Sequence, residues 1–388
     1  MPDAQRAGPT TAKERFDEYL NQMLESQARA EALAGGALRR RFRIAGNDIE
    51  LSLAHPALAE LFCNALAHLE IAVRDEPNFT FHIWDEASSG IGPPPPCWSR
   101  KEPNFTFHIW DEASSGIGPP PPCYSRKELL GHGEITGLID AERYLQVTAD
   151  KSIIAAHRSS RKAAVWLRSP GDVEEWERAA PLLALINWWA SGFGYFNVHA
   201  ASVGRPDGGV LILGPGGVGK SHTAIACLDS DLFYVSDDHC LLGTGGRPST
   251  ASVYSTAKLF ASDLHRFPML QQREKEAFRT QEDKAVFYLN TIVPDRLSSG
   301  FPIRAVLLPH PSGRRDTQIM RAPASAALLF LGPDNVLRWP SAGRIAFGRF
   351  ASALRSLPCF RLEAGSDLSQ IPKTIASLLD TVAAPERT

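Results

Sequence analysis

Apolar residues near the start of the chain recur every three or four positions, which is the spacing of one helix face. They are Phe16, Leu20, Met23, Leu24 and Ala28. Thr11 and Glu14 have the spacing of a capping box, and Gly35 follows the last apolar turn. The pattern predicts an amphipathic helix over residues 12–34. Such a helix packs on its own domain or, alternatively, contacts a partner or a second copy of the chain.

Further along the chain, alternating and helical patterns mark more elements. They predict strands at 41–44, 49–53, 195–203 and 303–308, helices at 56–69, 173–190 and 371–379, and a three-stranded meander over 143–168. We expect three parts from this order: an N-terminal helix (1–36), an α+β region (37–170) and a second, larger domain (171–388).

A tandem repeat of 26 residues interrupts the α+β region. Residues 76–101 and 102–127 are identical except that Trp98 is replaced by Tyr124. Such near-identity indicates a recent duplication or an error in the gene model. Each copy has one short alternating strand and a loop ending in four prolines, which favours a stiff loop or, alternatively, a polyproline recognition site. Because one strand fills one slot in a sheet, we expect one copy to dock and the other to be an insertion.

Composition narrows the class of protein. The 388 residues are 44% hydrophobic and 22% charged, as in soluble globular chains. A net charge of −2 gives no basic field for nucleic acid or acidic membranes. The six cysteines have no metal-finger or C-x-x-C spacing, and the first residues lack the apolar core of a signal peptide. We therefore expect a cytoplasmic protein with no nucleic-acid or membrane partner.

The most informative stretch follows an apolar run that begins at Val210 and predicts a buried strand. It has the pattern G-x-x-x-x-G-K-S and is followed by a helical run. Its residues are Gly214, Pro215, Gly216, Gly217, Val218, Gly219, Lys220 and Ser221. Strand, glycine turn and helix together are typical of a P-loop, whose backbone N–H groups and helix start surround a polyphosphate. Lys220 would then reach the β- and γ-phosphates, and the Ser221 hydroxyl would bind Mg²⁺.

The same glycines allow a different interpretation. Gly214, Gly216 and Gly219 also fit the dinucleotide-binding pattern, with acidic residues downstream. A dinucleotide turn, however, has no need of a cation and a hydroxyl directly after its last glycine. Lys220 and Ser221 therefore favour ATP with Mg²⁺ as the ligand.

A second apolar run, Leu232–Val235, ends in two aspartates. A strand that delivers acidic residues beside a P-loop resembles a Walker B motif, in which one carboxylate supports Mg²⁺ and another accepts a hydroxyl proton. Asp237 and Asp238 are the candidates; a turn with two solvated aspartates is the alternative. Lys258 and Lys284 could be phosphate-binding cations, but we expect them to be solvated.

From residue 195 to 240, the strand ending near His199, the glycine loop and the Asp237-Asp238 pair resemble the catalytic core of the HPr kinase/phosphorylase superfamily. That group shares its fold with the ATP-dependent phosphoenolpyruvate carboxykinases. The resemblance implies an α/β P-loop domain with a mixed sheet, beside the N-terminal α+β region. It also implies that Asp238 is the general base for a serine hydroxyl, that Asp237 supports the metal, and that His199 and Lys220 lie near the transferred phosphate.

On this resemblance the chain would be an ATP- and Mg²⁺-dependent serine kinase of a peptide or protein, such as a ribosomally made precursor peptide of the lasso type. A homo-oligomer is compatible with it. The family's downstream glycine-rich signature, with its glutamate and arginine, is not found here. Alternatives from other classes are a non-catalytic ATP sensor or peptide-recruiting protein, a nicotinamide-dependent oxidoreductase, and carboxykinase chemistry.

Overall fold

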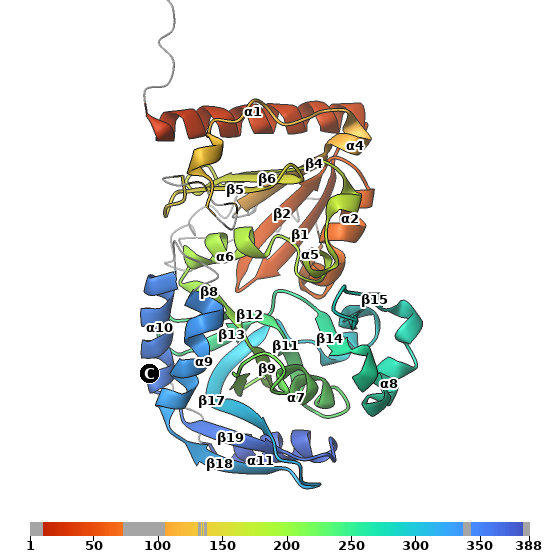
Figure 1. The fold of residues 1–388 in the computed structure, drawn as a ribbon, viewed down its shortest axis with the longest axis vertical. Coiled ribbons are helices and arrows are strands. Elements are labelled where there is room, and N and C mark those ends of the chain that lie inside the picture. The colour runs from red at the N-terminus through yellow and green to blue at the C-terminus, as the bar shows by residue number, and fades with distance from the viewer. Residues whose placement is uncertain are drawn as a thin grey trace, which may run out of the picture.

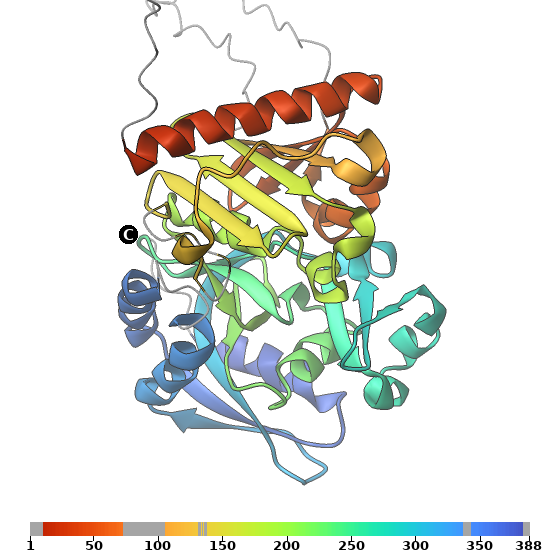
Figure 2. The same ribbon diagram turned by 45° about the horizontal axis from the view of Figure 1, so that its top comes forward.

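Helix α1 (Ala12–Leu33) lies across one face of a sheet formed by the N-terminal part of the chain (Figure 1). The capping box is formed: the Thr11 hydroxyl accepts a hydrogen bond from the Glu14 backbone N–H, and the Glu14 carboxylate accepts one from the Thr11 backbone N–H. In this computed structural model, the described residues are 11–72, 105–130, 133, 135, 138–336 and 343–382. Figure 2 shows α1 in front of the sheet that it covers.

The described strands of the N-terminal sheet run in the order β3-β1-β2-β4-β7-β6-β5. Their bounds are β1 Leu38–Ile44, β2 Asn47–Leu53, β3 Glu70–Ile71, β4 Phe105–Asp111, β5 Arg143–Thr148, β6 Ser152–His157 and β7 Lys162–Leu167. Strand β4 is parallel to both neighbours, β2 and β7, and the other pairs are antiparallel. The sheet is therefore mixed, and the predicted meander over 143–168 is confirmed as its β5–β7 part.

The second copy of the repeat supplies β4, so one copy does dock in the sheet. Its strand is buried between two neighbours, with Phe107 and Trp110 fully enclosed on opposite faces. The first copy, residues 76–101, lies outside the described residues, and the prediction of an insertion there stays a prediction.

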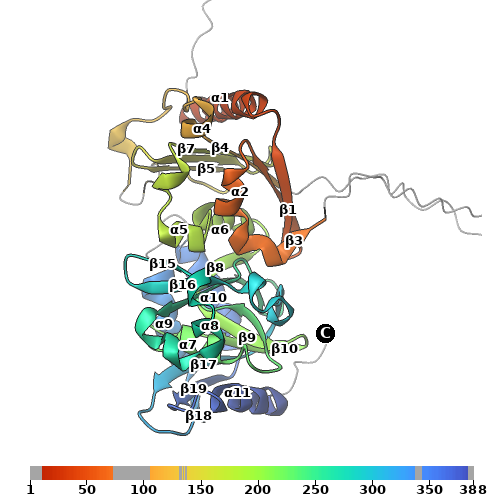
Figure 3. The ribbon, with the colours of Figure 1, turned by 90° about the vertical axis from the view of Figure 1, so that its right-hand side faces the viewer.

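Short helices cover the other face of this sheet and separate it from the C-terminal part (Figure 3). They are α2 Ala57–Phe62, η1 Asn64–Leu69, α5 Glu175–Ala179 and α6 Leu183–Ser191; α4 Glu112–Ser115, η2 Arg126–Glu128 and η3 Pro170–Asp172 lie in connections. One core joins β1, β2, β4, β7, α2, η1, α6 and the residues Leu241, Ala251, Val253 and Tyr254. The predicted boundary at 170/171 thus falls between β7 and helices that share a core with it.

Two predicted helices are shorter than their hydrophobic patterns. The helix predicted over 173–190 is broken after α5, because Pro181 disfavours helical backbone at Ala180, which has φ −142° and ψ 67°. Leu182 then takes a left-handed φ of 57° before α6 begins. The helix predicted over 56–69 changes at Cys63 from α to 3₁₀ geometry.

The C-terminal part contains a larger mixed sheet with the described order β11-β9-β10-β17-β13-β12-β8, to which β19 and β18 are added beside β17. Its strands are β8 Tyr195–His199, β9 Ala201–Arg205, β10 Gly208–Ile212, β11 Phe233–Ser236, β12 His239–Gly243, β13 Ser249–Ala251, β17 Gly300–Pro311, β18 Gln318–Ala322 and β19 Cys359–Ala364. Strand β17 joins two halves of this sheet. Its first residues pair with β13, in the half that also contains β12 and β8, and the rest pair with β10 and β19, in the half that also contains β9, β11 and β18.

The chain passes between these halves at two short crossovers. The strand predicted over 195–203 is interrupted at Ala200, whose N–H bonds to the Val198 carbonyl, so that β8 pairs with β12 while β9 pairs with β10 and β11. The second crossover, from β11 to β12, consists of Asp237 and Asp238. The sheet therefore folds back on itself, and both crossovers lie where its halves meet.

Helices cover both faces of β10, which explains its unbroken apolar sequence. Val210 and Ile212 pack toward α7 (Lys220–Ala226) and α11 (Gln370–Thr381), whereas Leu211 packs toward α9 (Ala324–Val336) and α10 (Gly343–Arg355). A small sheet in the order β14-β16-β15 stands beside α7. Its strands are β14 Thr256–Phe260, β15 Phe278–Arg279 and β16 Lys284–Tyr288, with η4 Ala261–Arg266, α8 Pro268–Gln271, η5 Glu274–Glu276, η6 Leu289–Thr291 and η7 Pro294–Arg296 around them. No helix of the described residues is both long and apolar enough to cross a membrane.

Candidate active site

The glycine loop lies between β10 and α7, as the sequence predicts. Gly217 and Gly219 have φ values of 78° and 103°, which side-chain-bearing residues rarely adopt. A Cβ atom at either position would meet nothing within 4 Å. Glycine is therefore needed there for backbone conformation, and the space beside these residues is open to a ligand.

Lys220 is held under the loop. Its side chain is buried, and Nζ donates to the carbonyl oxygens of Gly214 at 2.8 Å and Pro215 at 3.1 Å. The ammonium group thus lies inside the curve of the loop, where a P-loop needs a positive charge for phosphate oxygens.

Asp238 is surrounded by basic side chains from three strands. Its Oδ1 lies 3.1 Å from His199 Nε2, and its Oδ2 lies 2.6 Å from Lys258 Nζ and 3.7 Å from His239 Nε2. The register of β8 and β12 sets His199 directly opposite His239, with ring centroids 5.7 Å apart. Burial alone would raise the pKa of Asp238, but Lys258, His239 and His199 hold it well below its usual range. Asp238 is therefore an ionised carboxylate at neutral pH.

Asp237 points the opposite way, into the protein. Its Oδ1 accepts from the Tyr234 hydroxyl at 3.0 Å, and its Oδ2 accepts from the Lys258 backbone N–H at 2.9 Å. Burial, together with the charge of Asp238, raises the pKa of Asp237 to about 6. The side chain thus anchors β14 to the crossover.

The loop and the acidic pair meet at Ser221. Its Oγ lies 3.5 Å from the carbonyl oxygen of Asp237. The structure therefore brings Ser221, Asp237, Asp238 and His199 together around one crossover, while the metal role of Asp237 stays a prediction.

Three partners in this cluster were not predicted as site residues: Tyr234, His239 and Lys258. His239 follows Asp238 directly, but only strand register reveals that it faces His199. Lys258 was expected to be solvated, yet its side chain is 16% exposed and bonded to Asp238. The alternation in β14, where Ala257 and Leu259 are buried on the other face, is the signal that could have located it. Lys284, expected to be solvated as well, is 31% exposed and pairs with the exposed Glu282.

The residues present fit a magnesium ion bound with a polyphosphate. Among the described residues there is no group of three or more histidine, cysteine or acidic side chains that could hold a metal alone. Mg²⁺ at such a loop takes most of its ligands from phosphate and water, however, and needs only one or two from the protein. The Ser221 hydroxyl and the backbone carbonyl oxygen of Asp237 are the groups that would hold it, because both carboxylate oxygens of Asp237 already accept hydrogen bonds.

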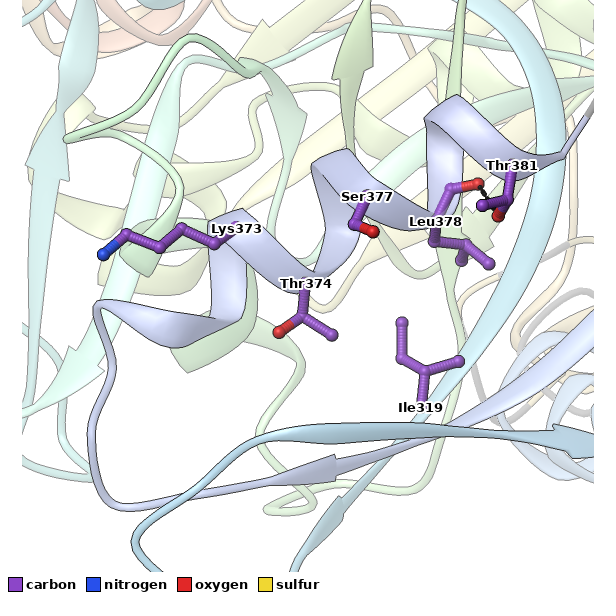
Figure 4. A pocket seen from close by; sticks show the side chains of 6 residues that line it. All are labelled: Ile319, Lys373, Thr374, Ser377, Leu378 and Thr381. Atoms are coloured by element: carbon purple, nitrogen blue, oxygen red, sulfur yellow. Dashed lines mark hydrogen bonds between the residues drawn. The ribbon is translucent and has the colours of Figure 1, made fainter.

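Two surface hollows lie away from this cluster. One of about 410 Å³ lies between α11 and β18 (Figure 4) and is lined by Ile319, Lys373, Thr374, Ser377, Leu378 and Thr381. The other, of about 330 Å³, is lined by Phe105, Arg158, Arg161, Trp189, Gly192 and Phe193. Neither includes a predicted site residue.

Comparison with known proteins adds little to this picture. No known family matches the chain, and no curated protein matches it. Among the solved structures that match is the Hpr(Ser) kinase/phosphatase from Coxiella burnetii, with a TM-score of 0.28 and 11% sequence identity, covering 47% of this chain and 90% of that one. No family is assigned from a similarity at this level.

Proposed function

We propose that this protein is an ATP- and Mg²⁺-dependent kinase that phosphorylates a serine hydroxyl of a peptide or protein. One observation carries the proposal. Asp238 is an ionised carboxylate held by basic side chains. It directly follows Asp237, whose carbonyl oxygen lies 3.5 Å from the Ser221 hydroxyl in the loop. A base and a phosphate loop are thus neighbours, as phosphoryl transfer to an alcohol requires.

In the proposed reaction the serine oxygen forms a bond to the γ-phosphorus, and the bond from that phosphorus to the bridging oxygen of ADP breaks. Asp238 accepts the proton of the serine hydroxyl. Lys220 neutralises charge on the transferred group, and His199 positions the Asp238 carboxylate through its 3.1 Å contact. Mg²⁺, held by Ser221 and Asp237, would neutralise the phosphates and align them.

We infer that the P-loop part has the fold of the HPr kinase C-terminal domain and the carboxykinases. The mixed sheet supports this, with the P-loop strand β10 antiparallel to β9 and parallel to β17. The position of His199 at the end of β8, the strand before β9, supports the same fold. The buried Lys220 ammonium favours phosphate over a dinucleotide as the loop's ligand.

A second candidate is a sensor or recruiting protein that binds ATP without transferring phosphate. The observation in its favour is that both carboxylate oxygens of Asp238 already have basic partners. In this arrangement an incoming hydroxyl competes with these partners for the Asp238 oxygens. Both candidate functions require ATP binding, but only the kinase transfers phosphate to a peptide.

The test is transfer from γ-labelled ATP with Mg²⁺ to serine-containing peptides encoded near the gene. Wild type should label a peptide, and Asp238→Asn should bind ATP but lose about 10²–10⁴-fold in transfer, the usual contribution of a general base. Lys220→Ala should lose both ATP affinity and transfer. Unchanged transfer in Asp238→Asn would remove Asp238 as the base, tight ATP binding with no labelled peptide would support the sensor, and full activity in Lys220→Ala would disprove the P-loop assignment.

A further inference from the structure

The arrangement of Asp238 raises a question about how it could act as a base. Both of its oxygens contact cations or histidines, and the shortest contact, 2.6 Å from Lys258 Nζ to Oδ2, competes with a serine hydroxyl for that oxygen. The two histidines are held by strands β8 and β12, which pair with each other through these very positions. Lys258, in contrast, reaches Asp238 at the end of a flexible four-carbon stem. Lys258 is therefore the partner most able to leave.

Lys258 is also placed next to the phosphate loop. Its backbone N–H donates to Asp237 Oδ2 at 2.9 Å, and the carbonyl of the same Asp237 lies 3.5 Å from Ser221 Oγ. Helix α7, which begins with Lys220 and Ser221, packs against β14. The Lys258 ammonium is thus bound to Asp238, and the preceding residue, Asp237, contacts Ser221 of the loop.

Building on the proposed function, we propose that Lys258 is a second phosphate-directed cation, which Asp238 holds in the absence of nucleotide and which moves to the terminal phosphate of bound ATP. A terminal phosphate carries more negative charge than one carboxylate and therefore competes well for the ammonium. The move leaves Asp238 Oδ2 open to accept the proton of a serine hydroxyl. The Lys258–Asp238 contact is then an inhibitory contact that ATP releases and ADP, lacking the terminal phosphate, does not.

The competing explanation is that Lys258 only neutralises Asp238. The two explanations make different predictions for a protein in which residue 238 carries no charge. If Lys258 binds phosphate, its removal must still weaken ATP binding in an Asp238→Asn background. If it only neutralises Asp238, its removal in that background changes nothing.

The experiment is calorimetric titration of Mg²⁺–ATP and Mg²⁺–ADP into five proteins. They are wild type, Asp238→Asn alone, and Asp238→Asn combined with Lys258→Met, Lys258→Arg or Lys284→Met. Removing both members of a buried ion pair is usually tolerated by the fold, and the arginine variant keeps the positive charge. Lys284→Met is the matched control, because Lys284 lies on the neighbouring strand and pairs with an exposed glutamate.

We expect Lys258→Met to weaken ATP binding about tenfold, the effect of one charge-assisted hydrogen bond, and to leave ADP binding unchanged. Lys258→Arg should retain most of the ATP affinity, and Lys284→Met should match Asp238→Asn. Equal ATP affinity with and without Lys258, or equal losses for ATP and ADP, would overturn the inference while leaving the kinase proposal standing. Failure of wild type and Asp238→Asn to bind either nucleotide would overturn both.

Discussion

Replacing Asp237 by asparagine should make the protein more stable at neutral pH, although this residue lies in the candidate site. The Asp237 side chain is 1% exposed. The Tyr234 hydroxyl has one proton but faces two acceptors, Asp237 Oδ1 at 3.0 Å and the Thr256 carbonyl at 2.7 Å. An asparagine amide could donate to the tyrosine oxygen while its own carbonyl accepts from the Lys258 N–H. Each of these groups would then have a partner, and position 237 would carry no buried charge.

The size of the effect follows from the pKa of Asp237. Burial and the neighbouring Asp238 raise it to about 6, from an ordinary value of 3.8. The folded state therefore binds this proton more tightly than the unfolded state, so the free energy of unfolding falls as pH rises from about 4 to about 6. At about 1.4 kcal/mol per pH unit, the ionised carboxylate costs about 3 kcal/mol above pH 6.

The assay is urea unfolding of wild type and Asp237→Asn between pH 4 and pH 8. The variant should equal wild type near pH 4 and exceed it by about 3 kcal/mol above pH 6. Asp231→Asn is the control, because Asp231 is fully exposed and should give no pH-dependent difference. A variant less stable than wild type at pH 7, or a difference independent of pH, would show that the charged carboxylate is favoured and refute the reasoning.

Two further predictions concern the N-terminal part. Deleting residues 76–101 should preserve the fold, because the second copy forms β4. Shortening the 33-residue connection 72–104 to seven residues should add at most about 1.4 kcal/mol to the free energy of unfolding. A loss above about 2 kcal/mol in urea unfolding would contradict this. Arg158→Met should lower the free energy of unfolding by about 3 kcal/mol or more in the same assay, with Arg161→Met as the exposed control. A smaller loss would mean that the hydrogen bonds of the Arg158 guanidinium contribute little to stability. Arg158 bonds at 2.7–2.9 Å to the carbonyl oxygens of Ala141, Trp188 and Trp189.

The elements that local chemistry determines could be predicted from the sequence. The capping box at Thr11 and the glycine loop each depend on residues within a few positions of one another. The mixed α/β class follows from the same local patterns. Pro181 was the exception, since the broad apolar face of 173–190 concealed a local signal that ends the helix there.

The missed part of the site depends on contacts between distant segments. Lys258 belongs to a strand whose neighbours are set by tertiary pairing, and nothing near it in the sequence marks Asp238 as its partner. His239 faces His199 only because β8 and β12 pair in one register. Local patterns thus located the glycine loop, Lys220 and the two aspartates, whereas the side chains that surround Asp238 could be found only from the fold.

The two crossovers between the halves of the large sheet also bear on how the protein acquires activity. The glycine loop follows β10 in one half, whereas the His199–His239 pair lies between β8 and β12 in the other. A chain in which only one half had formed would have the glycine loop or the histidine pair but no assembled candidate site. Pairings between distant segments are also the slowest to form during folding. Activity should therefore be the last property regained on refolding, later than helix content or tryptophan burial, and it would report directly on closure of the sheet.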